Sequence, residues 1–282
     1  MKVTFWGTRG SIPVPGRETI RYGGNTTCVV LELQSGHRLI IDAGTGIRSL
    51  GDMLNQSGEP LDLDMFVTHI HWDHIMGFPF FRPIYLPSTV IRIHGCLRSY
   101  KGIKATFDNK MGDGFFPVKF DDLPSKIIFH DYLATGFMTI GNTSIRAIEL
   151  QHPQGGMGMR FTEDGLSMVF LTDNELRQDA WPGRTPADYA DFCSGADLLI
   201  HDCQYLTEEI AAHRGWGHSD VTSVIDLAIA AGVKRLSLFH HDPNRTDEQM
   251  DRLVVIAREI ARDRGGDKLQ IEAAVEGDTL DV

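Results

Sequence analysis

Cysteine is scarce in this sequence. The four cysteines, Cys28, Cys96, Cys193 and Cys203, are scattered along the chain and form no CxxC pair. A disulfide framework or a thiolate zinc site needs closely spaced cysteines, so the sequence favours neither. Few and unpaired cysteines are typical of proteins in a reducing compartment, and we therefore expect a cytoplasmic protein.

Long apolar runs and an excess of basic residues are also missing. No apolar stretch approaches the roughly 20 residues of a membrane-spanning helix, and residues 1–11 lack the pattern of a secretory signal. The formal net charge is -11, with 38 acidic residues against 27 Lys and Arg. A broad nucleic-acid interface normally needs a basic surface. We expect neither a membrane protein nor an extended nucleic-acid binder, although a locally positive site can still take one anionic substrate.

The composition is that of an ordinary globular protein, since 42% of the 282 residues are hydrophobic. We expect one domain over residues 1–282. An amphipathic pattern that stops before two glycines predicts a helix over Asp247–Asp263. Short apolar runs predict strands at 3–6, 28–33, 39–41, 65–67, 167–171 and 198–200. Strands and helices in both halves indicate an α/β protein with two sheets and helices outside them.

One segment interrupts this pattern. Between residues 99 and 124 the sequence becomes irregular and contains Asp113-Gly114-Phe115-Phe116-Pro117. Long loops inside compact domains usually serve a function or are mobile. We predict an insertion or lid over residues 99–124 that limits the size of a substrate.

Three of the 12 histidines and one aspartate stand within six positions, at His69-Ile70-His71-Trp72-Asp73-His74. A predicted strand ends just before them and Gly77-Phe78-Pro79 limits any helix after them, so they lie on a strand-end loop. Imidazole nitrogens and carboxylates are good ligands for a borderline dication such as zinc. The segment therefore predicts a metal site. A polar loop with hydrogen-bonded histidines is the structural alternative.

This segment is the HxHxDH signature of the metallo-β-lactamase-fold superfamily, which the chain resembles over nearly its whole length. The resemblance implies a four-layer αββα sandwich of two mixed sheets flanked by helices, with metals at an edge between the sheets. It implies that one ion binds His69, His71 and His152, and that Asp173 spans both ions. The second ion would take Asp73, His74 and His240.

Two positions in this set have alternatives. His241 is adjacent to His240 and can be the last ligand in its place. Asp42 follows the predicted strand 39–41 and matches a family aspartate that orients ligand histidines, but it also fits a simple turn residue. The implied cofactors are two divalent metal ions, zinc first, with manganese or iron as alternatives.

The implied charge of the site suits an anionic substrate. Two dications, Asp73, Asp173 and a bridging hydroxide sum to roughly +1, so an acidic protein keeps a positive pocket. Such a site presents metal-bound hydroxide as a nucleophile and clamps the attacked group from both sides. Phosphorus esters fit this chemistry.

The segments His201-Asp202 and Gly215-Trp216-Gly217-His218-Ser219 resemble the phosphodiesterase branch that includes ribonuclease Z. The resemblance makes His218 the group that contacts the scissile phosphate and protonates the leaving oxygen, with Asp202 as its orienting carboxylate. General-acid catalysis of this kind is worth about 10² to 10⁴ in rate. The predicted catalytic residues are therefore Asp73, His218 and Asp202. Alternatively, His218 is a helix-entry residue beside Ser219, which would cap a helix over residues 220–231.

The spacing of the ligands in the sequence limits the range of possible substrates. Ribonuclease Z inserts a long arm that grips transfer RNA between the third histidine and the bridging aspartate, whereas His152 and Asp173 are only 21 positions apart here. We therefore predict no transfer RNA arm and a small, cyclic or linear nucleotide-like phosphodiester as substrate. A homodimer is a family-level expectation.

Two other functions remain as alternatives. A glyoxalase II-like thioester hydrolase uses the same motif, but the pattern at His201, Asp202 and His218 disfavours it. A non-catalytic metal-binding or scaffold protein is disfavoured by the complete ligand set. Arg21, Tyr22, Asn25 and Arg160 are weaker candidates for substrate contact, and each also fits a solvated loop.

Overall fold

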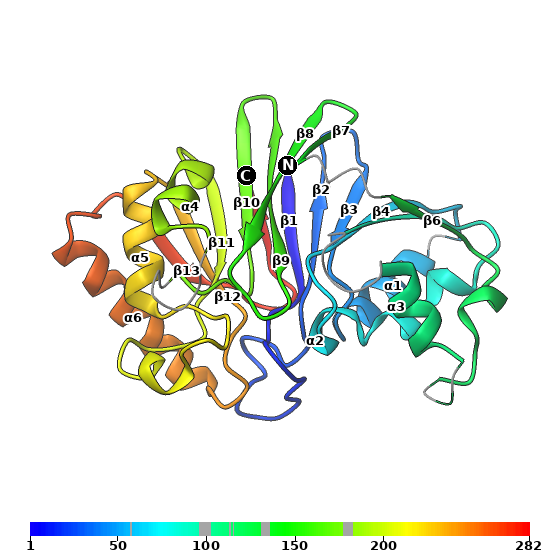
Figure 1. Ribbon diagram of the computed structural model, residues 1–282, viewed down its shortest axis with the longest axis horizontal. Coiled ribbons are helices and arrows are strands. Elements are labelled where there is room, and N and C mark those ends of the chain that lie inside the picture. Colours follow the sequence, from blue (N-terminus) through cyan, green and yellow to red (C-terminus); the bar gives the residue numbers. More distant parts are fainter. Residues whose placement is uncertain (57, 96–102, 113, 115, 131–135, 177–182) are drawn as a thin grey trace.

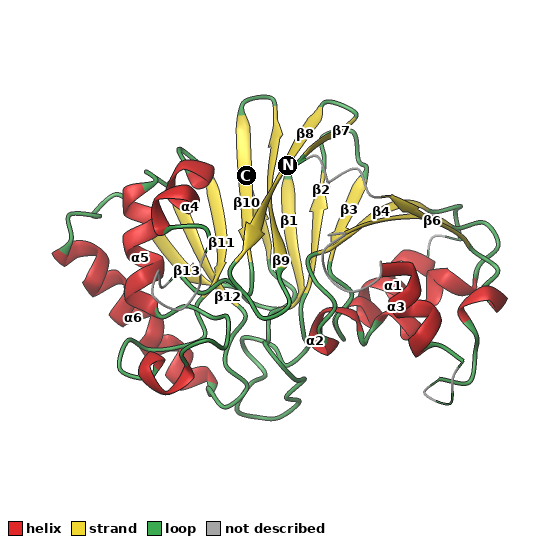
Figure 2. Ribbon diagram, in the orientation of Figure 1, coloured by secondary structure: helices red, strands yellow, loops and turns green. Residues whose placement is uncertain are grey.

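The computed structural model describes residues 1–282 except 57, 96–102, 113, 115, 131–135 and 177–182. Two seven-stranded sheets pack face to face, and helices cover both outer faces (Figures 1 and 2). Both sheets contain parallel and antiparallel pairs. The predicted sandwich of two mixed sheets flanked by helices is confirmed.

The first sheet has the order β14-β1-β2-β3-β4-β5-β6, and its pairs are parallel from β3 to β6. Its strands are β1 Lys2–Gly7, β2 Cys28–Glu32, β3 Arg38–Ile41, β4 Asp62–Val67, β5 Val90–Gly95, β6 Lys126–His130 and β14 Thr279–Asp281. The helices on its outer side are α1 Ile47–Asn55, α2 Trp72–Ile75 and α3 Ile103–Lys110, with 3-10 turns at Phe78–Phe80, Arg82–Tyr85 and Phe120–Asp122.

The second sheet has the order β13-β12-β11-β10-β9-β8-β7, and its pairs are parallel from β13 to β10. Its strands are β7 Phe137–Ile140, β8 Thr143–Leu150, β9 Gly156–Glu163, β10 Leu166–Leu171, β11 Leu198–Asp202, β12 Arg235–Phe239 and β13 Gln270–Ala273. Its outer helices are α4 Pro186–Cys193, α5 Val221–Ala230 and α6 Asp247–Asp263, with a 3-10 turn at Ile210–His213.

Three apolar layers hold the sandwich together. On β4, Met65 points into the layer under the helices of the first sheet, whereas the adjacent Phe66 points into the layer between the sheets. Phe66 meets Phe161 of the second sheet edge to face, with ring centroids 5.7 Å apart. Strands that are buried on both faces consist of continuous apolar residues. Such runs in the sequence therefore predicted the strands.

Most predicted elements are confirmed, including α6 and the six strands. One helix start was interpreted wrongly. Helix α5 is capped by Asp220, whose carboxylate accepts from the amides of Thr222 and Ser223, and not by Ser219. The Ser219 hydroxyl is already engaged, because it donates to the carbonyl of Asn174 at 2.6 Å. No described helix is both long and apolar enough to cross a membrane.

The predicted lid, residues 99–124, falls partly on residues 99–102, 113 and 115, which lie outside the described residues. The described remainder contains α3 and the 3-10 turn Phe120–Asp122, where the sequence suggested irregular structure. Phe107 is buried and stacks on Phe78, with ring centroids 4.2 Å apart. The lid function itself stays a prediction.

The topology brings the strand ends together at one end of the sandwich. Parallel strands point the same way, so the loops that follow β4, β10, β11 and β12 can meet beyond their carboxyl ends, where ligands bind in open α/β sheets. Figure 2 shows long loops gathered at one end of both sheets, and α2 lies at this end (Figure 1). Six of the seven predicted metal ligands follow β4, β10 or β12, and His152 follows β8, which pairs antiparallel with β7 and β9.

Candidate metal centre

The seven predicted ligand side chains converge in two neighbouring groups. The nitrogens of the first group and the nitrogen and oxygen atoms of the second group each lie within 4.8 Å of one another. All except His71 are buried. The first group is His69, His71 and His152, and the second is Asp73, His74, Asp173 and His240. These are the residues that the resemblance assigned to the two ions, and His152, Asp173 and His218 form a third group of possible ligand atoms that are equally close to one another.

Asp173 lies between the two groups and turns one oxygen to each. Its Oδ2 is 3.7 Å from Nε2 of His69 and 3.7 Å from Nε2 of His152. Its Oδ1 is 3.2 Å from Nε2 of His74 and 3.2 Å from Nε2 of His240. A carboxylate in this position can coordinate one cation with each oxygen.

The spacing of these atoms is compatible with a shared cation, and the shorter contacts, such as His152 Nε2 to His71 Nδ1 at 2.9 Å, also lie within hydrogen-bond distance. Nε2 of His74 is 3.3 Å from Asp73 Oδ2, and Nε2 of His240 is 3.1 Å from the same oxygen. Two ligands about 2.1 Å from one tetrahedral zinc ion lie roughly 3.4 Å apart. The Nε2 atoms of His69 and His74 are buried without a hydrogen-bond partner, so their lone pairs are available to a metal. The donor set therefore fits two divalent cations.

The charges of the cluster also favour cations. Burial by itself would raise the pKa of the Asp173 carboxyl, but the surrounding His240, His74 and His69 outweigh it and hold that pKa well below its usual range. Burial lowers the pKa of His69 well below its ordinary value and lowers that of His152 to about 4. His69 and His152 are thus neutral beside an ionised carboxylate, as metal ligands need to be. At His74, by contrast, burial is outweighed by Asp73 and Asp173, which raise its pKa well above the ordinary value.

Asp42 supports the cluster from behind. It is fully buried at the end of β3, and its Oδ2 accepts from Nδ1 of His74 at 2.8 Å. The same carboxylate accepts from the amide and the hydroxyl of Thr68 at 2.7 and 2.8 Å. These bonds fix the ring of His74 so that Nε2 faces Asp73 and Asp173. The geometry is that of an orienting carboxylate rather than a simple turn residue.

Left-handed backbone conformations mark this end of the molecule. Six described residues other than glycine have positive φ, and five of them belong to the cluster or contact it. Asp42 and His240 follow strands directly, Asp173 follows β10 after one residue, and Ser11 and Gln154 come from loops. Strained backbone of this kind costs free energy and collects at functional sites.

Ser11 and Gln154 were missed in the sequence. The amide of Ser11 donates to Asp73 Oδ2 at 2.7 Å, and Oε1 of Gln154 accepts from Nε2 of His71 at 2.7 Å. Neither residue type signals a metal site, and Ser11 acts through its backbone. The sequence offered one weak indication of such a role, which is that Gln154 stands two positions after the predicted ligand His152.

The structure separates His240 from its neighbour. Nε2 of His240 lies between Asp73 and Asp173, whereas Nε2 of His241 donates to the carbonyl of Ala274 at 2.8 Å. Burial, with help from Arg9, lowers the pKa of His241 to about 3. His241 is thus a neutral core residue that faces away from the cluster. Gly10 lies against the ring of His240, because an added Cβ there would be 2.5 Å from Nδ1.

His218 lies beside the cluster and close to Asp202. Its Nδ1 is 3.5 Å from Asp202 Oδ2 and 4.0 Å from Asp173 Oδ2. Asp202 is fully buried at the end of β11, where its oxygens accept from the amides of Asn174 and Ser219 at 3.1 and 3.0 Å. The predicted histidine and carboxylate therefore lie next to each other at the edge of the cluster, but Nδ1 of His218 makes no hydrogen bond.

The four weaker candidates have structural partners of their own. Arg21 and the hydroxyl of Tyr22 both bind Asp251, so these two residues tie a loop to α6. The amide side chain of Asn25 donates to Glu276. Arg160 donates to the carbonyls of Phe192 and Ser194 at the end of α4. None of these contacts is to the cluster.

A second group of histidines is held by hydrogen bonds instead. Asp64 accepts from Nε2 of His37 at 2.7 Å and from Nε2 of His94 at 2.6 Å. These distances are those of direct hydrogen bonds and are shorter than the spacings in the candidate metal centre. We assign this group to structure.

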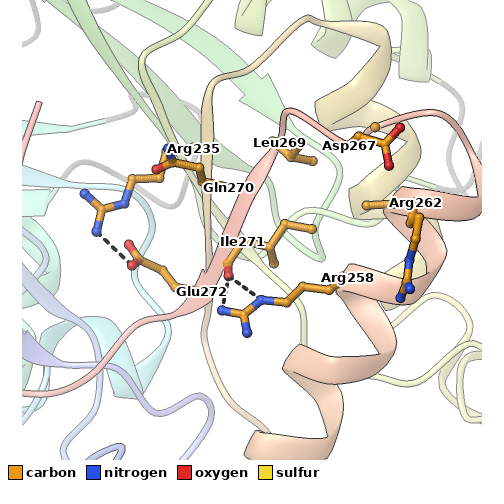
Figure 3. Close-up of a pocket in the computed structure, with 10 residues that line it drawn as sticks. Arg235, Arg258, Arg262, Asp267, Leu269, Gln270, Ile271 and Glu272 are labelled. Atoms are coloured by element: carbon orange, nitrogen blue, oxygen red, sulfur yellow. Dashed lines mark hydrogen bonds and ion pairs between the residues drawn. The ribbon is translucent and has the colours of Figure 1, made fainter.

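A cavity of about 540 Å³ lies between α6 and β13 (Figure 3). Arg235 binds Glu272 at its wall, and Arg258 donates to the carbonyl of Ile271. Arg235 begins β12, whereas His240 follows the other end of this strand. The cavity is therefore remote from the metal centre.

Comparison with known proteins places the chain among metal-dependent enzymes. Residues 37–241 match the Beta-lactamase superfamily domain. Ribonuclease Z of Natronomonas pharaonis is 26% identical over a 321-residue alignment that covers 100% of this chain and 98% of that protein. Ribonuclease Z of Geobacillus kaustophilus is 24% identical, with 92% and 94% covered.

Solved structures show the same fold. The metallo-beta-lactamase fold protein YhfI from Bacillus subtilis superposes with a TM-score of 0.71 at 17% identity, covering 99% of this chain and 98% of that one. A diphosphatase of the PhnP family gives a TM-score of 0.67 at 16% identity, covering 100% and 97%. The short form of human tRNase Z gives 0.64 at 20% identity, covering 100% and 99%. The chain belongs to the beta-lactamase superfamily, has ribonuclease Z-like relatives, and is a metal-dependent hydrolase.

Proposed function

We propose that this protein is a dinuclear phosphodiesterase that acts on a small, nucleotide-like phosphodiester. The observation that carries the proposal is the position of Asp173, which turns one oxygen to each histidine group and lies 4.0 Å from His218. Residues that would hold two cations and a residue that would donate a proton therefore lie close together. Relatives named ribonuclease Z support a phosphorus ester as the substrate.

Each of the two residue groups would bind one cation. His69, His71 and His152 would hold one divalent cation, and Asp73, His74 and His240 would hold the other, with Asp173 as a ligand to both. Zinc suits these donors best, and manganese or iron are alternatives. When bound, the two cations would supply Lewis acidity and an activated water molecule.

His218 would donate the proton that the leaving oxygen needs. Its Nδ1 faces Asp202, which would hold the ring and stabilise its charged form. Burial lowers the pKa of His218, but Asp202 and Asp173 outweigh it and raise that pKa above its ordinary value. A protonated imidazole beside the bridging carboxylate is the form that a general acid requires.

The compact chain favours a small substrate. The interval between His152 and Asp173 is filled by β9, β10 and the turn at Asp164 and Gly165, so it contains only an ordinary hairpin. The 321-residue alignment is longer than this chain, so the aligned ribonuclease Z carries residues that this chain lacks. Cytoplasmic location and a homodimer remain predictions.

A pair of substrates tests the proposal. The zinc- or manganese-loaded protein should hydrolyse bis(p-nitrophenyl) phosphate and, more slowly, diphenyl phosphate, whose phenolate is the poorer leaving group. His218→Ala should retain two metal ions and lose about 10²-fold or more in kcat on diphenyl phosphate. Hydrolysis of glutathione thioesters instead would favour the glyoxalase II-like alternative. Two bound metals without any hydrolysis would favour a metal-binding scaffold.

A further inference from the structure

Glu175 is a buried carboxylate that the proposed mechanism does not use. It stands two residues after Asp173 and has no exposed surface. Its Oε1 and Oε2 accept from the amide of Gly215 at 3.1 and 3.0 Å, and Oε2 also accepts from the amide of Gly217 at 3.0 Å. Burying a carboxylate is costly unless hydrogen bonds compensate it, so these bonds hold the loop firmly.

The loop held by Glu175 carries two contacts to the centre. The carbonyl of Gly217 accepts from Nδ1 of His152 at 3.0 Å, which leaves Nε2 of His152 facing the cluster. The next residue is His218, the proposed general acid. Gly215 and Trp216 are exposed, whereas the chain is buried from Gly217 onward. Glu175 therefore binds the loop at the point where it enters the protein.

The backbone of this loop depends on its glycines and on the segment after Asp173. Gly215 and Gly217 both have positive φ, at 81° and 87°. The amide of Glu175 donates to the carbonyl of Gln151 at 2.9 Å, so the same residue also touches the strand end that precedes His152. The loop and the His152 strand end are thus fixed to one segment that continues from the bridging aspartate.

We propose that Glu175 is a positioning residue that places His218 for proton donation and holds the carbonyl of Gly217 against His152. This inference rests on the proposed function, since it assigns Glu175 a role in the same reaction. In Glu175→Gln, one side-chain oxygen is replaced by an NH₂ group, which cannot accept from a backbone amide. The loop then loses at least one hydrogen bond and His218 moves from Asp202.

The dependence on the leaving group separates positioning from general stability. p-Nitrophenolate leaves without help from an acid, whereas phenolate needs a proton more. We expect Glu175→Gln to lower kcat on diphenyl phosphate by about 10²-fold, and on bis(p-nitrophenyl) phosphate by less than about 10-fold, at saturating metal. The double variant with His218→Ala should be no slower on diphenyl phosphate than His218→Ala alone, because the two residues act as one unit.

Glu163→Gln is the matched control. Glu163 is also buried and also accepts from a backbone amide, that of Gln34 at 3.0 Å, but it ends β9 beside the Asp164 turn. We expect this variant to affect both substrates equally. In ¹⁵N-HSQC spectra of metal-free protein, the amide signals of Gly215 and Gly217 should shift in Glu175→Gln and stay in place in Glu163→Gln.

The outcomes distinguish this inference from the proposed function. If wild type cleaves neither diester, the proposed function is wrong. If wild type cleaves both and His218→Ala shows the selective loss, equal losses in Glu175→Gln on both substrates would overturn the role of Glu175. Should Glu175→Gln fold poorly, Glu175→Asp, which keeps the charge with a shorter reach, must show the same selectivity in weaker form. Equal losses on both substrates in Glu175→Asp would also overturn the inference.

Discussion

Nδ1 of His74 donates to Oδ2 of Asp42 at 2.8 Å, and both side chains are completely buried. This bond turns Nε2 of His74 toward Asp73 and Asp173, which are its neighbours in the candidate metal centre. Asp42 itself adopts a left-handed backbone conformation, with φ of 62°. The strained backbone of Asp42 thus keeps a carboxylate behind one candidate ligand.

The first prediction concerns this carboxylate. Asp42→Asn should lower the affinity for the second ion by about 10- to 100-fold, since partners of ligand histidines typically have effects of this size. Metal content measured against a competing chelator gives the affinity. Asp164→Asn is the control, because Asp164 also has positive φ but lies exposed in the β9–β10 turn. Unchanged affinity in Asp42→Asn would contradict the orienting role.

The second prediction uses two glycines of one loop. An added Cβ at Gly217 would lie 1.9 Å from Nδ1 of His152, whereas one at Gly215 would meet nothing within 4 Å. Both positions have positive φ, so alanine costs about 1–2 kcal/mol of backbone strain at each. Gly217→Ala should in addition displace His152 and lower activity by more than about 100-fold, while Gly215→Ala, which keeps the amide that binds Glu175, should lower activity by much less. Thermal unfolding and kcat measured on both variants provide the check, and equal activities would refute it.

The HxHxDH motif and the family resemblance pointed to seven residues that the fold brings together, because each of them follows an apolar strand. His69 and His71 belong to one contiguous motif, and the parallel strands that precede His240 and Asp173 determine where those residues meet. Ser11, Gln154 and Glu175 were not predictable in this way. Ser11 acts through its backbone amide, Gln154 through a side chain on a left-handed turn, and Glu175 through a carboxylate that binds amides. These contacts form only after distant loops have packed together.

The third prediction separates His240 from His241. His240→Ala should lose the second ion, because its Nε2 lies 3.1 Å from Asp73 and 3.2 Å from Asp173. His241→Ala should retain both ions but destabilise the fold by about 1–3 kcal/mol, since the carbonyl of Ala274 loses its buried donor. Elemental analysis and urea unfolding distinguish the two variants. Loss of metal in His241→Ala alone would reverse the assignment.

The last prediction concerns acid stability at the hydrogen-bonded histidine group. Burial alone would raise the pKa of Asp64, but hydrogen bonds from His37 and His94 outweigh it and place that pKa far below its usual range. Because the folded pKa is lower than the unfolded value of about 3.9, the stabilisation is complete above that pH and is lost as the pH falls below it. Asp64→Asn should therefore be less stable than wild type by about 2–3 kcal/mol at pH 7.

That stability difference should shrink as the pH falls below about 4, because Asp64 of the unfolded wild-type chain then binds a proton while the folded protein keeps the carboxylate ionised. Urea unfolding of metal-free wild type and variant from pH 7 to pH 3 measures it, and the ligand carboxylates cancel because both proteins contain them. Asp62→Asn is the control, since Asp62 pairs with Arg92 but its side chain is 60% exposed, so its effect should be small. A difference between wild type and Asp64→Asn that stays constant down to pH 3 would show that the ionised carboxylate of Asp64 is not what stabilises this group.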